Sequence, residues 1–281
     1  MKLKLTSQNH KFTVLAVASV LATAGLSSTV HAATTIWITD SQGRIGTVAS
    51  DTGVSTVIGN AGVVLTDIAF DPNGNLWGID TTQLYTINTG TGVATSVGSF
   101  GSGHTFMNGL TFASNGTLYA SGTDVVSGQL YDGLFTINTT TGVSTPLNNG
   151  IGVSGFSSAG DLAFDLGVLY LSVTDGTTSA LISVDPVTGF GTPIGQMAAD
   201  PNVYGLVHGD DGQVYAVDGT KVYSVNTGNA ALTFTSNYGG VVLTAANGAA
   251  ARTESGAGLV PEPASMALLG LAGIASLRRR R

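Results

Sequence analysis

The stretch DIAFDPNGNLWGID, Asp67 to Asp80, decides the fold, because it reads as a β-hairpin and recurs along the chain. Its central Asn73-Gly74 lies between two apolar runs, and Asn-Gly in that setting is the strongest short-range hairpin signal. Three later segments repeat the pattern: GLTFASNGTLYASG from Gly109, DLAFDLGVLYLSV from Asp161 and GLVHGDDGQVYAVD from Gly205. The chain is therefore expected to be built from repeated hairpins.

A second hairpin pattern accompanies the first. It reads RIGTVASDTGVSTVIG from Arg44, QLYTINTGTGVATSVG from Gln83, GLFTINTTTGVSTPLN from Gly133, ALISVDPVTGFGTPIG from Ala180 and KVYSVNTGNAALTFTS from Lys221. Its turn glycines, Gly53, Gly92, Gly142, Gly189 and Gly228, are spaced by 39, 50, 47 and 39 residues. Four strands in each period of this length are typical of a β-propeller blade.

The first unit lacks a leading strand and begins directly at TTIWITD, from Thr34. We predict that GVVLTAANG, from Gly240, supplies that strand, with Asn247-Gly248 as its turn, so that the C-terminal strand completes the N-terminal blade and closes the ring. The fold class is then all-β, a propeller of five four-stranded blades. An open β-sandwich or a solenoid of similar hairpins is the alternative.

The N-terminus is typical of a secretory signal peptide. Lys2, Lys4 and Lys11 precede or begin an apolar run that ends at Leu26, and cleavage is predicted between Ala32 and Ala33. A membrane-spanning first helix is the alternative. The chain has no cysteine, so disulfides do not support the exported protein.

The expected body is strongly acidic. Between Ala33 and Leu259 the chain keeps three basic residues and 16 of its 17 acidic ones, a net charge of −13. Such a body repels phosphate backbones, so nucleic acid is not an expected partner.

The chain ends with Val260-Pro261-Glu262-Pro263, an apolar run from Ala264 to Leu277, and four arginines, Arg278, Arg279, Arg280 and Arg281. As a helix the run would reach only about 21 Å, short of the roughly 30 Å hydrocarbon core. Arginines after such a run stay on the cytoplasmic side. A permanent tail anchor would need a longer run.

This three-part ending closely resembles the PEP-CTERM sorting signal of proteins secreted by Gram-negative bacteria, many of which make extracellular polysaccharide. The resemblance implies signal peptidase and an exosortase as processing partners. It also implies transient anchoring in the inner membrane, followed by a place at the cell surface or in the extracellular matrix. The expected domains are a signal peptide (1–32), a propeller (33–250), a flexible linker (251–259) and a sorting segment with a short apolar helix (260–281).

From Ala33 to Ala250 the repeats resemble the broad class of YVTN- and NHL-like propellers. That class includes lactonases, lyases and many binding modules, so the fold alone does not fix the function.

Two carboxylates stand out within the repeat. Asp67 and Asp161 occupy equivalent positions at the start of the innermost strand of the second and fourth blades, while Gly109 and Gly205 occupy that position elsewhere and Asn108 precedes one of them. Because innermost strands line the channel of a propeller, these groups are expected to converge at one mouth. Hard oxygen ligands suit calcium, and we predict a metal site of Asp67, Asp161 and Asn108. Some gluconolactonase-like propellers place a metal in this way. The alternative is that each Asp binds backbone amides and stabilises the ring.

Other candidates are weaker. His208 replaces a repeated Phe, so its ring is expected to pack within the blade, although a proton-carrier role in the channel is the alternative. One repeat position carries aromatic rings that are either sugar-contacting residues or blade core: Trp37, Trp77, Tyr119, Tyr170 and Tyr215. No catalytic or cofactor-binding residue is assigned.

The sequence therefore favours an exported, non-catalytic binding or structural module for polysaccharide, protein or a cation. The alternative is a metal-dependent hydrolase, lactonase or lyase with its site at the channel mouth.

Overall fold

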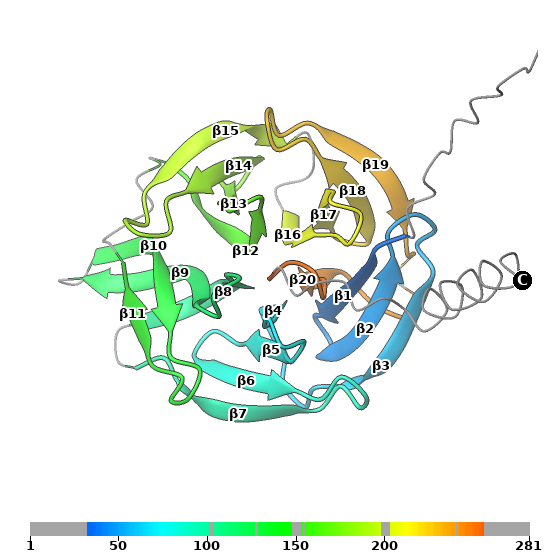
Figure 1. Cartoon of the computed structure of the whole chain (residues 1–281), viewed down its shortest axis with the longest axis horizontal. Coiled ribbons are helices and arrows are strands. Elements are labelled where there is room, and N and C mark those ends of the chain that lie inside the picture. Colours follow the sequence, from blue (N-terminus) through cyan, green and yellow to red (C-terminus); the bar gives the residue numbers. More distant parts are fainter. Residues whose placement is uncertain are drawn as a thin grey trace, which may run out of the picture. The chain divides into compact units, whose positions relative to one another are not determined.

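The computed structural model describes residues 33–101, 104–126, 129–147, 153, 155–197, 203–239 and 241–255. These residues form an all-β ring of five sheets, each of four antiparallel strands (Figure 1). The five-blade propeller predicted from the repeats is therefore confirmed. No helix long and apolar enough to cross a bilayer occurs in the described ranges. The predicted signal peptide, its cleavage site after Ala32 and the sorting segment lie outside those ranges.

The blades follow one another along the chain. Blade 1 contains β20, β1 (Thr35–Asp40), β2 (Arg44–Ala49) and β3 (Ser55–Asn60), and blade 2 contains β4 (Asp67–Phe70), β5 (Leu76–Ile79), β6 (Gln83–Ile87) and β7 (Ala94–Ser99). Blade 3 contains β8 (His104–Phe112), β9 (Leu118–Val126), β10 (Gln129–Ile137) and β11 (Ser144–Pro146). Blade 4 contains β12 (Ser157–Asp165), β13 (Val168–Thr174), β14 (Ser179–Val184) and β15 (Gly191–Met197). Blade 5 contains β16 (Val203–His208), β17 (Val214–Asp218), β18 (Lys221–Val225) and β19 (Leu232–Asn237).

The ring is closed by β20 (Ala246–Ala250), which pairs with β1 and is the innermost strand of blade 1. The prediction that a C-terminal strand completes the N-terminal blade is thus confirmed, but its register was wrong. Asn247-Gly248 is not the turn after that strand, because both residues lie near the start of β20 itself. The turn after β20 lies beyond Ala250, where Glu254 donates its backbone N–H to the carbonyl of Ala251.

The inner hairpins form as their turn residues dictate. In blade 2, Gly74 has a φ of 82°, which favours glycine. The Asp71 carboxylate accepts the backbone N–H groups of Asn73 and Asn75, both at 2.9 Å, and so fixes the turn.

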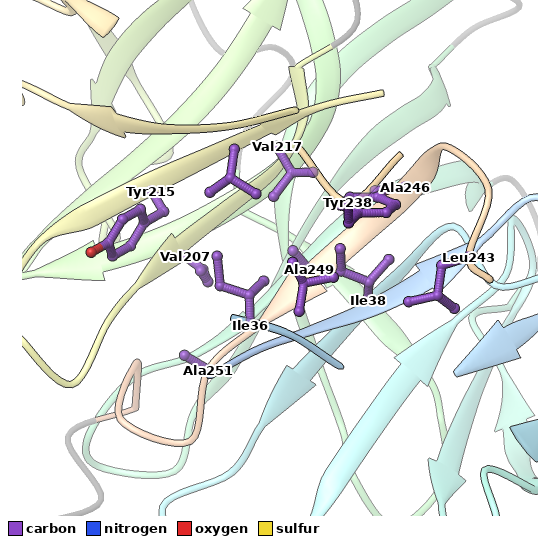
Figure 2. Packing of buried hydrophobic residues seen from close by; sticks show 12 residues of the cluster. Ile36, Ile38, Val207, Tyr215, Val217, Tyr238, Leu243, Ala246, Ala249 and Ala251 are labelled. Atoms are coloured by element: carbon purple, nitrogen blue, oxygen red, sulfur yellow. The ribbon is translucent and has the colours of Figure 1, made fainter. Parts of the chain in front are cut away.

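The core lies between neighbouring blades. Figure 2 shows one cluster in which Ile36 and Ile38 of β1 pack with Val207 and Val217 of blade 5 and with Ala249 of β20. Aromatic rings repeat this contact between other blades: Trp37 meets Phe70, Trp77 meets Phe112 and Tyr119 meets Phe164, with centroids 5.4–6.0 Å apart. Of the aromatic residues at the shared repeat position, Trp37, Tyr170 and Tyr215 are buried, and Trp77 and Tyr119 are half-buried.

The packed body continues past the expected boundary at Ala250. Ala251, Glu254 and Ser255 are buried, so the ring includes residues that the sequence had assigned to a linker. Glu254 accepts a hydrogen bond from the backbone of Phe70 in blade 2 and thereby joins the end of the chain to the ring.

Candidate functional site

The mouth at which the innermost strands begin holds a small pocket of about 250 Å³. We call it the start mouth; it is lined by Thr66, Asn108, Ala159, Gly160, Tyr204 and Asn247. Every blade contributes at least one of these residues. Thr66 precedes β4, and Tyr204 and Asn247 are the second residues of β16 and β20, whereas Asn108 lies farther along β8 and Ala159 and Gly160 farther along β12. The pocket is therefore a product of the repeat rather than of one loop.

Most of the residues that line this pocket lie in β-bulges. In the ladder between β8 and β9, Thr105 pairs with Thr123 and Gly109 pairs with Ser121. Three residues of β8, 106–108, therefore lie opposite a single residue of β9. In β12, Ala159 and Gly160 lie in an equivalent bulge between Ser158 and Leu162. Bulges of this kind are common next to functional sites, because they re-aim side chains.

The remaining two bulges are single residues. Tyr204 is skipped between the paired residues Val203 and Gly205 of β16, and Asn247 is skipped between Ala246 and Gly248 of β20. Four of the five innermost strands thus break their ladder at the residue that reaches the mouth.

The chemistry of the start mouth is neutral. Asn108 donates its Nδ2 to the carbonyl of Ser158 at 2.9 Å and accepts the Ser158 hydroxyl at 2.8 Å. Asn247 donates its Nδ2 to the carbonyl of Leu65 at 3.1 Å. These bonds hold the amides in place, and the Tyr204 side chain stands beside them at the surface.

Directly below the mouth lie Asp67 and Asp161, both with no exposed surface. Asp67 accepts the backbone N–H of Ile68 at 2.8 Å and that of Leu110, in the next blade, at 2.6 Å. Asp161 accepts Leu162 N–H and, from blade 5, Leu206 N–H, both at 2.6 Å. Each carboxyl group therefore joins its own blade to the following one.

Burial raises the pKa of Asp67 well above its ordinary value, and the neighbouring Asp161 charge and the hydrogen bond between the two side chains raise it further. Burial likewise raises the pKa of Asp161, although hydrogen bonds from Leu206 and Asp67 lower it in part. The two carboxyl groups share a hydrogen bond, so the pair titrates as a unit.

This arrangement bears on the predicted calcium site. Calcium takes six to eight oxygen ligands, whereas all four oxygens of the two carboxyl groups already accept backbone N–H groups. Asn108 directs its amide to Ser158. Within the described ranges no group of three His, Cys, Asp or Glu side chains is arranged to hold a metal. The calcium site therefore stays a prediction, while the observed hydrogen bonds are those that the alternative interpretation describes, in which each Asp binds backbone amides of the ring.

The opposite mouth, which we call the end mouth, holds a cavity of about 390 Å³ lined by Ala113, Ser114, Asn115, Phe164, Leu166, Gly167, His208, Thr253, Glu254 and Ser255. His208 is half-buried there, with Nε2 3.3 Å from a carboxylate oxygen of Asp165. Burial, together with the Asp161 charge, raises the pKa of Glu254 well above its ordinary value. In the part of the chain that the structure describes, Asp67, Asp161 and Glu254 make no ion pair, whereas the buried Asp40 pairs with Arg44 at 2.8 Å.

The sequence predicted that Asp67, Asp161 and Asn108 lie at one mouth; Asn108 lines it, whereas Asp67 and Asp161 are fully buried and do not line the pocket. Sequence reasoning missed Asn247, because that residue had been assigned to a turn, and Glu254, because it had been assigned to a linker. The signal for Asn247 was present in the repeat, since Asn247-Gly248 matches Asn108-Gly109.

Comparisons with known proteins agree with this architecture. Residues 259–281 match the PEP-CTERM protein-sorting motif, so the chain carries a signal for export and membrane-associated processing by an exosortase. No curated protein matches the chain. Among solved structures, one described in work on the de novo evolutionary emergence of a symmetrical protein is similar, with 17% identity, a TM-score of 0.50 and coverage of 75% of this chain and 96% of that one.

Two further neighbours are enzymes. A gluconolactonase from Xanthomonas campestris is 15% identical, with a TM-score of 0.47 and coverage of 70% of each chain. A streptogramin B lyase is 11% identical, with a TM-score of 0.41 and coverage of 73% of this chain and 65% of that one. At these identities the likeness concerns the propeller fold, and activities belong to those proteins alone.

Proposed function

We propose that the exported propeller is a non-catalytic binding module of the bacterial envelope or extracellular matrix, and that it holds a neutral, polyhydroxylated ligand such as a polysaccharide segment at the start mouth. The observation that carries this proposal is the set of bulges at Asn108, Gly160, Tyr204 and Asn247. The innermost strands of four blades have their β-bulge at the same level of the ring, and the bulged residues line the pocket.

The lining suits a sugar. Amide side chains both donate and accept hydrogen bonds, as sugar hydroxyls do, and an aromatic ring offers an apolar face to the C–H groups of a pyranose. Asn108 and Asn247 are held by their own hydrogen bonds, so less side-chain entropy is lost when a ligand binds. A pocket without a charged wall favours a neutral ligand over an ion.

The enzymatic alternative is a metal-dependent hydrolase, lactonase or lyase acting through Asp67 and Asp161. It requires a carboxylate oxygen that can reach a metal or a substrate. Both carboxyl groups instead have no exposed surface, and their oxygens accept backbone N–H groups. Calcium would have to reach these buried oxygens beside the N–H groups that they already accept.

The test is binding of the full chain to oligosaccharides prepared from envelope polysaccharide, measured by isothermal titration calorimetry in the presence and absence of calcium. Tyr204→Ala is expected to weaken binding at least tenfold. The matched control is Phe234→Ala, which removes another exposed aromatic ring from the same blade, on its outermost strand and away from the mouth.

Equal affinity for wild type and Tyr204→Ala would remove the ligand from the start mouth. Turnover of a lactone that is abolished by a chelator and by Asp161→Ala would replace the binding proposal with the enzymatic alternative. A rise in melting temperature with calcium would restore Asp67, Asp161 and Asn108 as a metal site.

A further inference from the structure

The face of the ring around the end mouth exposes apolar side chains at a repeated position. We call it the tether face. In each blade the turn between the third and fourth strands lies at the rim, at the same end of the sheet as the turn after the innermost strand, because these two strands run parallel. The residue after the turn glycine is exposed and apolar in four blades: Val54, Val93, Val143 and Phe190. The repeat thus places apolar residues around the rim of one face.

Blade 4 adds two more exposed apolar residues to this face. Leu166 is 95% exposed in the two-residue turn between β12 and β13, and Val187 is 80% exposed in the turn between β14 and β15. The two turns lie at the same end of the blade, because Leu169, near the start of β13, pairs with Val184, at the end of β14. Leu166, Val187 and Phe190 therefore lie at the same end of blade 4, and we call these three residues the blade 4 patch.

Leu166 is also an unusual choice for its position. Its φ is 49°, in the left-handed region that a bulky side chain rarely adopts. Two other blades have Asn-Gly in their inner turns, Asn73-Gly74 and Asn115-Gly116, and asparagine tolerates positive φ. An exposed leucine under backbone strain indicates a contact that the isolated ring does not show.

The chain leaves the described body at this same face. Ser255, the last described residue, lines the end-mouth cavity together with Leu166. Only eight residues, 256–263, separate Ser255 from the apolar run that starts at Ala264. Fully extended, they span at most about 30 Å. Once that run lies in a membrane, the tether face is held close to the bilayer at a high effective concentration, so weak apolar contacts suffice for docking.

We propose that the tether face docks on the lipid bilayer through the blade 4 patch while the sorting segment anchors the chain. The start mouth, at the other end of the ring, then faces away from the membrane and stays open to its ligand. This inference rests on the membrane anchoring that the sorting motif implies, and it adds an orientation to the proposed function.

The charges on the tether face determine which lipid composition it is expected to bind more strongly. Asp51, Asp185 and Asp210 are exposed in its turns, against one exposed cation, Arg252, whose guanidinium lies over the Phe70 ring at 5.0 Å. Acidic groups are repelled by anionic lipids. Docking is therefore expected to be stronger on a zwitterionic bilayer than on one rich in anionic lipid.

The absence of cysteine from the chain permits a clean test. The full chain with Leu166→Cys carries one environment-sensitive fluorophore and is reconstituted into phosphatidylcholine vesicles. The matched control is Thr177→Cys, in the exposed turn at the other end of blade 4. Emission from position 166 is expected to shift to the blue on reconstitution, with iodide quenching reduced at least threefold, while position 177 is unchanged. Adding Val187→Ser and Phe190→Ser to the Leu166→Cys chain is expected to abolish most of the shift.

Each other outcome overturns the inference in a distinguishable way. Equal spectra at positions 166 and 177, in chains that float with the vesicles, would show anchoring without docking. A chain that does not float would overturn the membrane anchoring itself. Blue-shifted emission in the absence of vesicles would mean that something other than lipid covers the blade 4 patch. If the shift does not depend on protein concentration, the chain's own apolar segment covers the patch; if the shift grows with concentration, a second copy of the chain does.

Discussion

Replacing Asp161 by alanine tests whether the buried carboxyl groups hold the blades together. The substitution leaves the N–H groups of Leu162 and Leu206 without their acceptor inside the ring. An unpaired buried donor costs about 1–3 kcal/mol, so the expected loss of unfolding free energy at neutral pH is about 2–6 kcal/mol. For a domain of this size each kcal/mol lowers Tm by roughly 2–4 °C. The matched control is Asp51→Ala, which removes an exposed carboxylate and is expected to change Tm little.

The double variant refines the argument. Because Asp67 and Asp161 share a hydrogen bond and repel each other once both are ionised, losses from Asp67→Ala and Asp161→Ala are not expected to add. Urea unfolding of the two single variants and the double variant gives the coupling energy directly. Strict additivity would show that the two side chains do not interact.

The same groups determine how stability depends on pH. The pKa values of Asp67, Asp161 and Glu254 are all raised in the folded state, mainly by burial. The folded protein therefore keeps protons that the unfolded chain releases, and stability falls as the pH rises above about 4, the ordinary carboxyl range. Below that range carboxylates with lowered pKa act in the opposite direction, as for Asp175, whose pKa the Thr177 hydroxyl lowers to about 2.

We expect Tm to be highest in mild acid and to decrease toward alkaline pH, as measured by circular dichroism across the pH range. Glu254→Gln removes one of the three titrations and is expected to flatten this decrease. A Tm that rises between about pH 5 and pH 8, or a Glu254→Gln profile parallel to that of the wild type, would refute the assignment of raised pKa values to these groups.

Three further substitutions or additions follow from the geometry. Leu166→Asn is expected to raise the unfolding free energy by about 0.5–1.5 kcal/mol, because asparagine tolerates the left-handed turn, and an unchanged urea midpoint would contradict that strain. Gly248→Ala is expected to destabilise the ring strongly, because an added methyl group overlaps Asp67 Oδ1; a native-like Tm would mean that the inner strands are less closely packed. Excess calcium is expected to leave Tm unchanged, since the carboxyl oxygens already accept backbone N–H groups, and a clear upward shift in a thermal scan would reverse that expectation.

The sequence predicted the ring well because its signals were local and repeated. A Thr-Gly turn recurs in all five outer hairpins and Asn-Gly marks two of the inner ones, and each such turn fixes one hairpin without reference to the rest of the chain. The register of β20 was harder to predict. Taken alone, Asn247-Gly248 has the sequence of a turn, and only its alignment with Asn108-Gly109 indicates that it belongs to an inner strand. The burial of Glu254 had no local signal at all, since it depends on the backbone N–H of Phe70, 184 positions away. The positions of Asp67 and Asp161 in the repeat were predictable. Their hydrogen-bond partners were not, because every residue except proline has a backbone N–H and the sequence does not indicate which of them a carboxylate binds.

The alternation of aspartate and glycine around the axis explains why the ring has two such carboxyl groups and not five. The equivalent positions in blades 2 to 5 and then blade 1 are Asp67, Gly109, Asp161, Gly205 and Gly248. At Gly205 an added methyl carbon would lie 2.9 Å from that of Ala249, and at Gly248 it would overlap Asp67. Side chains from two non-adjacent blades therefore fill the space that the glycines leave open.

The two carboxyl groups also divide the channel. Asp67 and Asp161 meet between the start mouth and the end mouth, and neither has exposed surface. The two mouths are thus separate pockets, of about 250 Å³ and about 390 Å³, with different linings. Under the proposed function, a ligand bound at the start mouth would lie on one side of the buried, hydrogen-bonded carboxyl groups and the tether face on the other. One face is then free to bind while the other is held to a surface, which is the arrangement that an anchored binding module requires.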